Sequence, residues 1–103
     1  MYRRKIGMEK DNKSIEFYKR LKIQLEENTS WPAVYLYKFI VPANKNNVEK
    51  IEQIFIDNKA NFSKRDSSKG TYSSVSIKVL MESPDCVIEK YIEVSKIEGV
   101  ISL

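Results

Sequence analysis

The stretch "RDSSKGTYSSVSIKV", residues 65–79, decides the fold because a tight turn runs directly into a strand. Asp66 and the serines after it favour a turn, and Gly70 can take the positive φ that such a turn needs. From Thr71 onward, apolar and polar residues alternate, which is typical of a strand with one face in a core. We therefore predict a β-hairpin whose second strand covers residues 71–81.

Further strands are predicted on both sides of this hairpin. Residues 34–41, "VYLYKFIV", are β-branched and aromatic and end before Pro42, which indicates a strand. Residues 60–65 are short and polar, as is typical of an edge strand, and residues 100–103 form a last strand after Gly99.

The remaining segments have the period of helices. Residues 14–28 carry an apolar stripe, and residues 44–57 carry a second one. Ser83-Pro84-Asp85 indicates the start of a third helix, because a serine cap, a proline in the first turn and an acidic residue suit a helix N-terminus. The predicted caps are Ser14 for the first helix, Asn44 or Asn47 for the second and Ser83 for the third.

The order of elements is a helix followed by β-α-β-β-α-β, the split βαβ or ferredoxin-like pattern. Right-handed crossovers then give an α+β sandwich with an antiparallel sheet of strand order 4-1-3-2 and two helices on one face. The chain is long enough for one domain. We predict that domain at residues 14–103, with its extra N-terminal helix, behind a flexible basic tail at residues 1–13.

Strand alternation divides the sheet into two faces. One set of side chains, which includes Val75 and Ile77, is predicted to pack on the helices. The other face is predicted to hold the following residues: Val34, Leu36, Lys38, Ile40, Tyr72, Ser74, Ser76, Lys78 and Leu80. Apolar patches of this kind are usually covered, here by the N-terminal helix or by a second copy. Alternatively, the lysines extend to solvent from a half-covered sheet.

The amino-acid content excludes several kinds of chemistry. The chain has one cysteine, Cys86, and no histidine, so it can form neither an internal disulfide nor a Ser-His-Asp triad, and it lacks the usual zinc ligands. Iron–sulfur ferredoxins of this topology need four cysteines. The loop after the first strand, "VPANKNN", lacks the glycine and arginine of an acyl-phosphate hydrolase. We expect no enzymatic activity, cofactor or metal.

The same reading bears on location and on nucleic acid. No apolar run approaches the length of about 20 residues that spans a bilayer, so we expect a cytoplasmic protein with no membrane partner. The net charge of +4 comes mainly from residues 1–13, and a start at Met8 would remove three of those cations. Lys69-Gly70 begins like an RNA-recognition motif, but Thr71 and Ser73 stand at its two stacking positions. RNA binding is therefore only the third hypothesis.

The hairpin "SSKGTYSSVSIKV" (67–79) and the preceding "WPAVYLYKFIVP" (31–42) closely resemble the YbeD-like family, small bacterial proteins to which no activity is assigned. The matching positions are Trp31-Pro32, Tyr37-Lys38, Ser67 or Ser68, Lys69, Gly70, Tyr72, Ser74 and Val75. The resemblance covers residues 14–103. It implies a ferredoxin-like fold similar to ACT domains, which pair through sheets or helices and bind small ligands. Many ACT domains have a glycine after the first strand, which "VPANKNN" lacks.

The leading hypothesis is a non-enzymatic, ACT-like regulatory domain that binds a small anionic ligand or a protein partner. The predicted site comprises Lys38, Ser67, Ser68, Lys69, Gly70, Tyr72, Ser74 and Lys78. Lysines would supply charge, serines hydroxyl donors and Gly70 close approach of the backbone. The alternative is a protein-protein adaptor without a ligand site. Homodimerisation through the sheet or the helices is compatible with both hypotheses.

Overall fold

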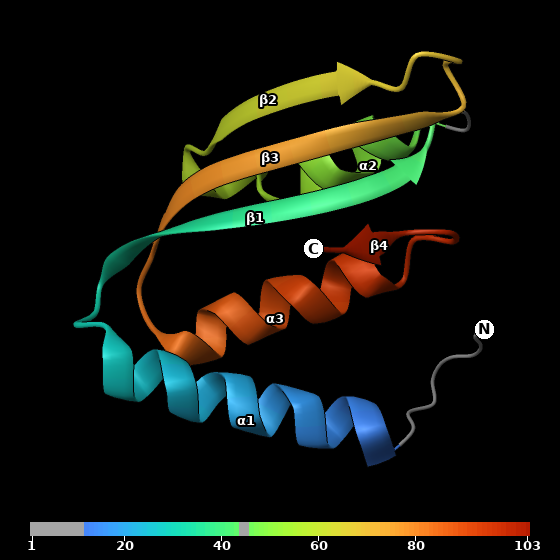
Figure 1. Ribbon diagram of the computed structural model, residues 1–103. Helices are drawn as coiled ribbons and strands as arrows, with labels where there is room; N and C mark the ends of the chain where they lie inside the picture. Colours follow the sequence, from blue (N-terminus) through green and yellow to red (C-terminus); the bar gives the residue numbers. More distant parts are fainter. Residues whose placement is uncertain (1–11, 44–45) are drawn as a thin grey trace.

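The computed structural model describes residues 12–43 and 46–103, with a four-stranded antiparallel sheet and helices packed beside it (Figure 1). The elements are α1 (Asn12–Asn28), β1 (Ala33–Pro42), α2 (Asn47–Ile54), the 3-10 turn η1 (Ile56–Asn58), β2 (Asn61–Asp66), β3 (Tyr72–Met81), α3 (Pro84–Ser95) and β4 (Ile101–Ser102). The strand order β2-β3-β1-β4 confirms the predicted ferredoxin-like topology.

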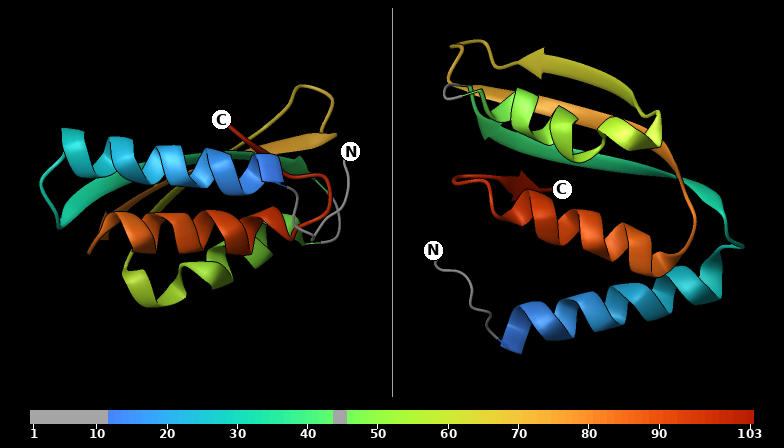
Figure 2. Two further views of the ribbon diagram at one scale, coloured as in Figure 1. Left: turned by 90° about the horizontal axis from the view of Figure 1, so that it is seen from below. Right: turned by 180° about the vertical axis from the view of Figure 1, so that it is seen from behind.

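The helices that cover the sheet lie on one side of it (Figure 2). Helices α2 and α3 lie against one sheet face, and α1 lies along α3 on its far side from β1. Trp31 comes three residues after the end of α1, and its Nε1 donates a hydrogen bond to the Leu25 carbonyl at 3.1 Å. The extra N-terminal helix is therefore an outer layer on α3.

Alternating side chains of β1 and β3 build the core, as the sequence predicts. Tyr37 lies opposite Ile77, and Phe39 lies opposite Val75, all of them buried. The helices contribute apolar residues to the same cluster. Its buried members are Tyr37, Phe39, Val41, Ile51, Phe55, Val75, Ile77, Val79, Met81, Val87, Val94 and Ile97.

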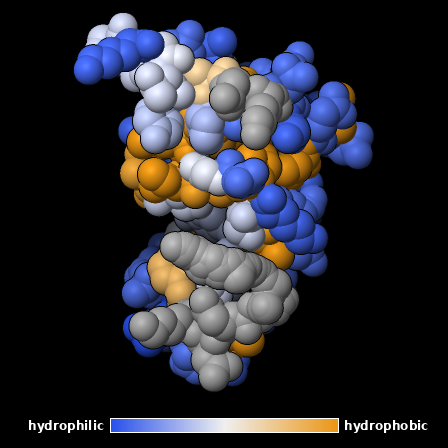
Figure 3. All heavy atoms as spheres, turned by 90° about the vertical axis from the view of Figure 1, so that its right-hand side faces the viewer, coloured by the Kyte–Doolittle hydropathy of each residue, from blue (hydrophilic) through white to orange (hydrophobic). Residues whose placement is uncertain are grey.

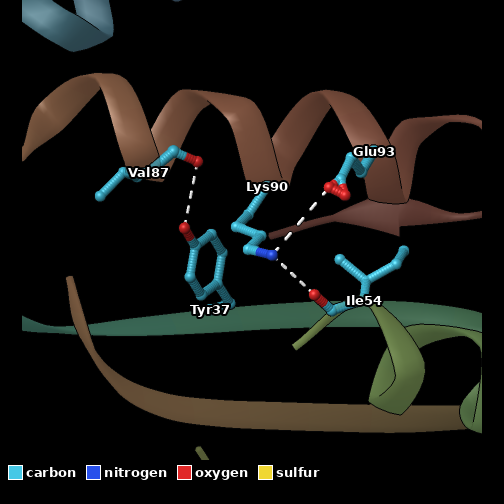
Figure 4. Close-up of polar contacts among 5 residues, drawn as sticks. All are labelled: Tyr37, Ile54, Val87, Lys90 and Glu93. Carbon is cyan, nitrogen blue, oxygen red and sulfur yellow. Dashed lines mark hydrogen bonds and ion pairs between the residues drawn. The ribbon is translucent and has the colours of Figure 1, made fainter. Parts of the chain in front are cut away.

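Two polar contacts attach α3 to the rest of the core (Figure 4). The Tyr37 hydroxyl donates to the Val87 carbonyl at 3.0 Å. Lys90 Nζ donates to the Ile54 carbonyl at 2.6 Å, and it lies 4.0 Å from a Glu93 carboxylate oxygen. Ile54 is the last residue of α2, and the last carbonyls of a helix have no partner within it. A lysine side chain beside the C-terminus of a helix can satisfy such a carbonyl. Tyr37 thus links α3 to β1, and Lys90 links α3 to α2.

The helix starts differ in part from the predictions. Helix α1 begins at Asn12, so Ser14 lies inside its first turn and is not the N-cap. The cap of α2 is Asn46 at φ 57°, a left-handed conformation that asparagine tolerates. The predicted Asn47 cap is wrong, because its buried Nδ2 donates instead to the Pro42 carbonyl at 3.0 Å. Asn44 and residues 1–11 of the tail predicted at 1–13 lie outside the described residues, whereas Asn12 and Lys13 belong to α1. Ser83 caps α3 as predicted.

Gly99 is expected to tolerate alanine less well than Gly70. Both residues have positive φ, +82° and +71°, where an L-residue costs about 1–2 kcal/mol. A Cβ on Gly99 would also lie 2.8 Å from Pro42 Cγ, whereas a Cβ on Gly70 would meet nothing within 4 Å. Urea denaturation of Gly99→Ala and Gly70→Ala should therefore show the larger loss of unfolding free energy for Gly99→Ala. Equal losses would mean that the Pro42 contact adds no strain.

Candidate functional site

The sheet face turned away from α2 and α3 is called the open face here. Because the register is known, its side chains can be placed in rows across the strands. The row through Lys38 contains Ser76 and Ser63, and the next row holds Leu36, Lys78 and Asn61. The open face consists of Val34, Leu36, Lys38, Ile40, Asn61, Ser63, Arg65, Tyr72, Ser74, Ser76, Lys78, Leu80 and Ile101.

The charged side chains of the open face all have one sign. Lys38, Lys78 and Arg65 come from three different strands, and none of the strand residues that form this face carries a carboxylate. The described ion pairs are Lys22–Asp85 and Lys90–Glu93, so in the described part of the chain these three cations have no ion-pair partner. Such a surface attracts negatively charged groups.

Large apolar side chains flank the cations on the open face. Val34 is 61% exposed and lies opposite Leu80, which is 56% exposed. Leu36 in the next row is 51% exposed, and Ile101 on β4 is also 51% exposed. Because α1 lies on α3, the alternative in which the N-terminal helix covers part of this face is wrong. Hydrophobic side chains also form a band across the end of the molecule seen in Figure 3.

The hairpin loop is held together by its own hydrogen bonds. The Ser67 amide donates to the Tyr72 carbonyl at 2.8 Å, and the Gly70 amide donates to the Ser67 carbonyl at 2.9 Å. The Tyr72 amide donates to Ser67 Oγ at 3.2 Å. A loop that cradles an anion needs several free N–H groups that converge. These three amides are already used, so Ser67 and Gly70 are explained as turn residues.

The predicted site residues form two groups, not one. Ser67, Ser68, Lys69 and Gly70 lie in the loop, whereas Lys38, Ser74 and Lys78 lie on the open face, with Tyr72 at the join. Lys78 lies six positions along the extended strand from Tyr72, a span of about 20 Å. Lys69 lies beyond that span, so one small ligand cannot contact both Lys69 and Lys78.

The register also explains one serine and adds a cation that sequence reasoning missed. Ser73 is buried, and its hydroxyl donates to Asp66 Oδ1 at 2.8 Å, so Ser73 stabilises the hairpin. Arg65 lies opposite Ser74 on the open face. Counting back across the loop from Ser74 would have placed Arg65 there, but only if the closing pair Asp66–Ser73 had been known.

Two other kinds of site were sought in the described residues. Residues 12–43 and 46–103 contain no group of three or more His, Cys, Asp or Glu side chains that could hold a metal ion. Within the same ranges, none of the helices combines the length and apolar character needed to cross a membrane. Cys86 is half-buried, and its amide donates to the capping Ser83 Oγ at 3.3 Å.

Comparison with known proteins places the chain in a family. A family model described as "Protein of unknown function (DUF493)" matches residues 26–103. A UPF0250 protein of Haemophilus ducreyi is 32% identical over 80 residues, which are 75% of this chain and 82% of that protein. A UPF0250 protein of Pasteurella multocida is 33% identical over 81 residues, 75% of this chain and 91% of that protein. No solved structure matches. The chain therefore belongs to the DUF493 or UPF0250 family, the YbeD-like proteins that its hairpin resembles.

Proposed function

We propose that this chain is a non-enzymatic, ACT-like regulatory or adaptor domain that holds a partner protein against its open face. The observation that supports this most is the set of three cations, Lys38, Arg65 and Lys78, on a face to which the strands contribute no carboxylate side chain. Exposed Val34, Leu36 and Leu80 lie beside them. A partner that presents carboxylates together with apolar side chains would complement this surface in charge and in hydrophobicity.

A protein fits this surface better than a small anion does. The open face is broad, and its cations lie on three neighbouring strands. Three amides of the loop, those of Ser67, Gly70 and Tyr72, are used within the turn and are not available to a compact anion. A lone cysteine suits the reducing cytoplasm, where we place this activity.

Charge reversal tests the proposed interface. We expect Lys38→Glu/Lys78→Glu to weaken partner binding at least about tenfold, because each lost charge contact is worth roughly 1.5–3 kcal/mol. The matched control is Lys50→Glu/Lys64→Glu, which makes the same change in net charge at exposed positions outside the open face. Proteins retained by the native chain are identified by mass spectrometry, purified, and titrated against both variants at low and high salt.

Several outcomes separate the alternatives. Equal loss with both variants would attribute binding to net charge, not to the open face. An anionic metabolite that raises the melting temperature of the native chain, but not that of Lys69→Ala/Lys78→Ala, would favour a small-ligand site. Salt-sensitive retention of single-stranded RNA would favour the third hypothesis.

A further inference from the structure

Strand β1 is paired along only part of one edge. All ten of its residues pair with β3 on one side. On the other side, only Phe39 and Ile40 pair with β4, and the Leu103 amide donates to the Lys38 carbonyl at 2.9 Å. Figure 1 shows β4 beside the end of β1 that leads to Pro42, and none of the described strands lies beside the opposite half. That half contains Val34 and Leu36.

Every second residue in this half of β1 points its backbone N–H and C=O outward from the sheet. The Ala43 amide bonds the Thr71 carbonyl next to β3, whereas the Lys38 carbonyl accepts its bond on the β4 side. Because backbone groups alternate along a strand, the even-numbered residues of β1 direct N–H and C=O toward β4. No described residue provides a hydrogen bond there for Val34 or Leu36. This edge can therefore accept another strand.

The two outer edges of the sheet differ in character. All six residues of β2 are exposed, and they include Lys64, Arg65 and Asp66. Charged side chains of this kind protect an edge strand against pairing. The unpaired half of β1 presents the apolar side chains of Val34 and Leu36 instead, both more than half exposed. The β1 edge is thus the one suited to pairing.

We propose that the β1 edge at Val34–Leu36 binds an extended segment of the partner protein, which adds to the sheet as a strand in line with β4. Its backbone would bond Val34 and Leu36, and its apolar side chains would lie beside theirs. A carboxylate on the same segment would meet Lys38, two residues further on the same face. This inference rests on the proposed function and specifies how the acidic and apolar partner is held.

Proline at Leu36 tests the backbone contact directly. Leu36→Pro removes an outward N–H and leaves the bonds between β1 and β3 intact, a position where edge strands accept proline. Leu36→Ala removes the same side chain but keeps the N–H. Lys64→Pro is the matched control, because the Lys64 N–H points outward from β2 on the opposite edge. Circular dichroism and melting temperature establish that each variant is folded.

The probe is a set of peptides selected from a random library on the native chain and measured by fluorescence anisotropy. We expect selected peptides to combine apolar and acidic residues, and to bind Leu36→Pro roughly tenfold more weakly than Leu36→Ala, the effect of about one hydrogen bond. Lys64→Pro should bind them like the native chain. Equal affinity for Leu36→Pro and Leu36→Ala, or failure to select any peptide, would overturn the inference.

Two further results separate this inference from the proposed function. Suppose that Lys38→Glu/Lys78→Glu lost partner binding while Leu36→Pro and Leu36→Ala bound the peptides equally well. That result would support partner binding on the open face and would reject strand addition at the β1 edge. If Leu36→Pro weakened peptide binding while Lys38→Glu/Lys78→Glu left partner binding unchanged, strand addition at the β1 edge would be supported and the proposed function would be rejected. If the native chain formed a dimer and Leu36→Pro dissociated it, the occupant of the β1 edge would be a second copy of this chain and not a partner protein.

Discussion

Tyr37→Ala is expected to lower the free energy of unfolding by about 3–5 kcal/mol, the usual cost of removing a large buried aromatic side chain. Tyr37 is completely buried at the centre of an aromatic cluster. Its ring centroid lies 4.8 Å from that of Tyr35, 5.0 Å from Phe55 and 4.9 Å from Tyr91. Since domains of this kind are stable by only about 5–15 kcal/mol, this variant should lose a large part of its stability.

Tyr37→Phe is the matched control for the alanine variant. It keeps the ring and removes only the hydroxyl that donates to the Val87 carbonyl, so we expect a loss of about 1 kcal/mol. Urea denaturation followed by circular dichroism gives both values. If the alanine variant lost no more than the phenylalanine variant, the ring would not be packed in the core as described.

The fold is expected to lose stability steeply above pH 10. Burial raises the pKa of the Tyr37 hydroxyl well above its ordinary value. Burial also raises the pKa of Tyr91, and its hydrogen bond with Tyr35, at 2.8 Å, adds to this shift. The folded state therefore keeps both tyrosines protonated at a pH where the unfolded chain ionises them. The contribution of these two tyrosines to the free energy of unfolding is fully present below about pH 10 and is lost as the pH rises above that value.

Denaturation at several pH values between neutral and strongly alkaline conditions measures this effect. Each of the two tyrosines should contribute a slope of at most about 1.4 kcal/mol per pH unit above pH 10. Tyr37→Phe/Tyr91→Phe should be less stable at neutral pH but show a shallower alkaline slope. The same slope in the native chain and in this variant would assign alkaline unfolding to other groups.

The parts of the fold predicted from the sequence were those set by local pattern. Alternation in β1 and β3 correctly placed Val75 and Ile77 in the core and Lys38 and Lys78 on the open face. The start of α3 was predictable because serine and proline act there through their own backbone geometry. In each case the deciding interaction lies within a few residues of chain.

The features that were missed depend on distant parts of the chain. The Asn47 cap was wrong because the side-chain amide of Asn47 donates its hydrogen bond to the Pro42 carbonyl at the end of β1. The sequence grouped Lys69 and Lys78 in one site because the length of β3 between Tyr72 and Lys78 was not considered. Arg65 was missed because its face depends on the closing pair of the hairpin, and one residue of slip would move it to the other face.

Helix α1 gives this chain two levels of stability. The family match begins at residue 26, so most of α1 lies outside it. Tyr18, Leu21 and Leu25 are only half-buried, and the Lys22–Asp85 ion pair at 3.0 Å is exposed to solvent. Because α3 stands between α1 and the sheet, α1 can unfold locally while the core keeps its packing. Slow amide exchange should therefore survive in β1 and β3 under conditions where α1 has already exchanged.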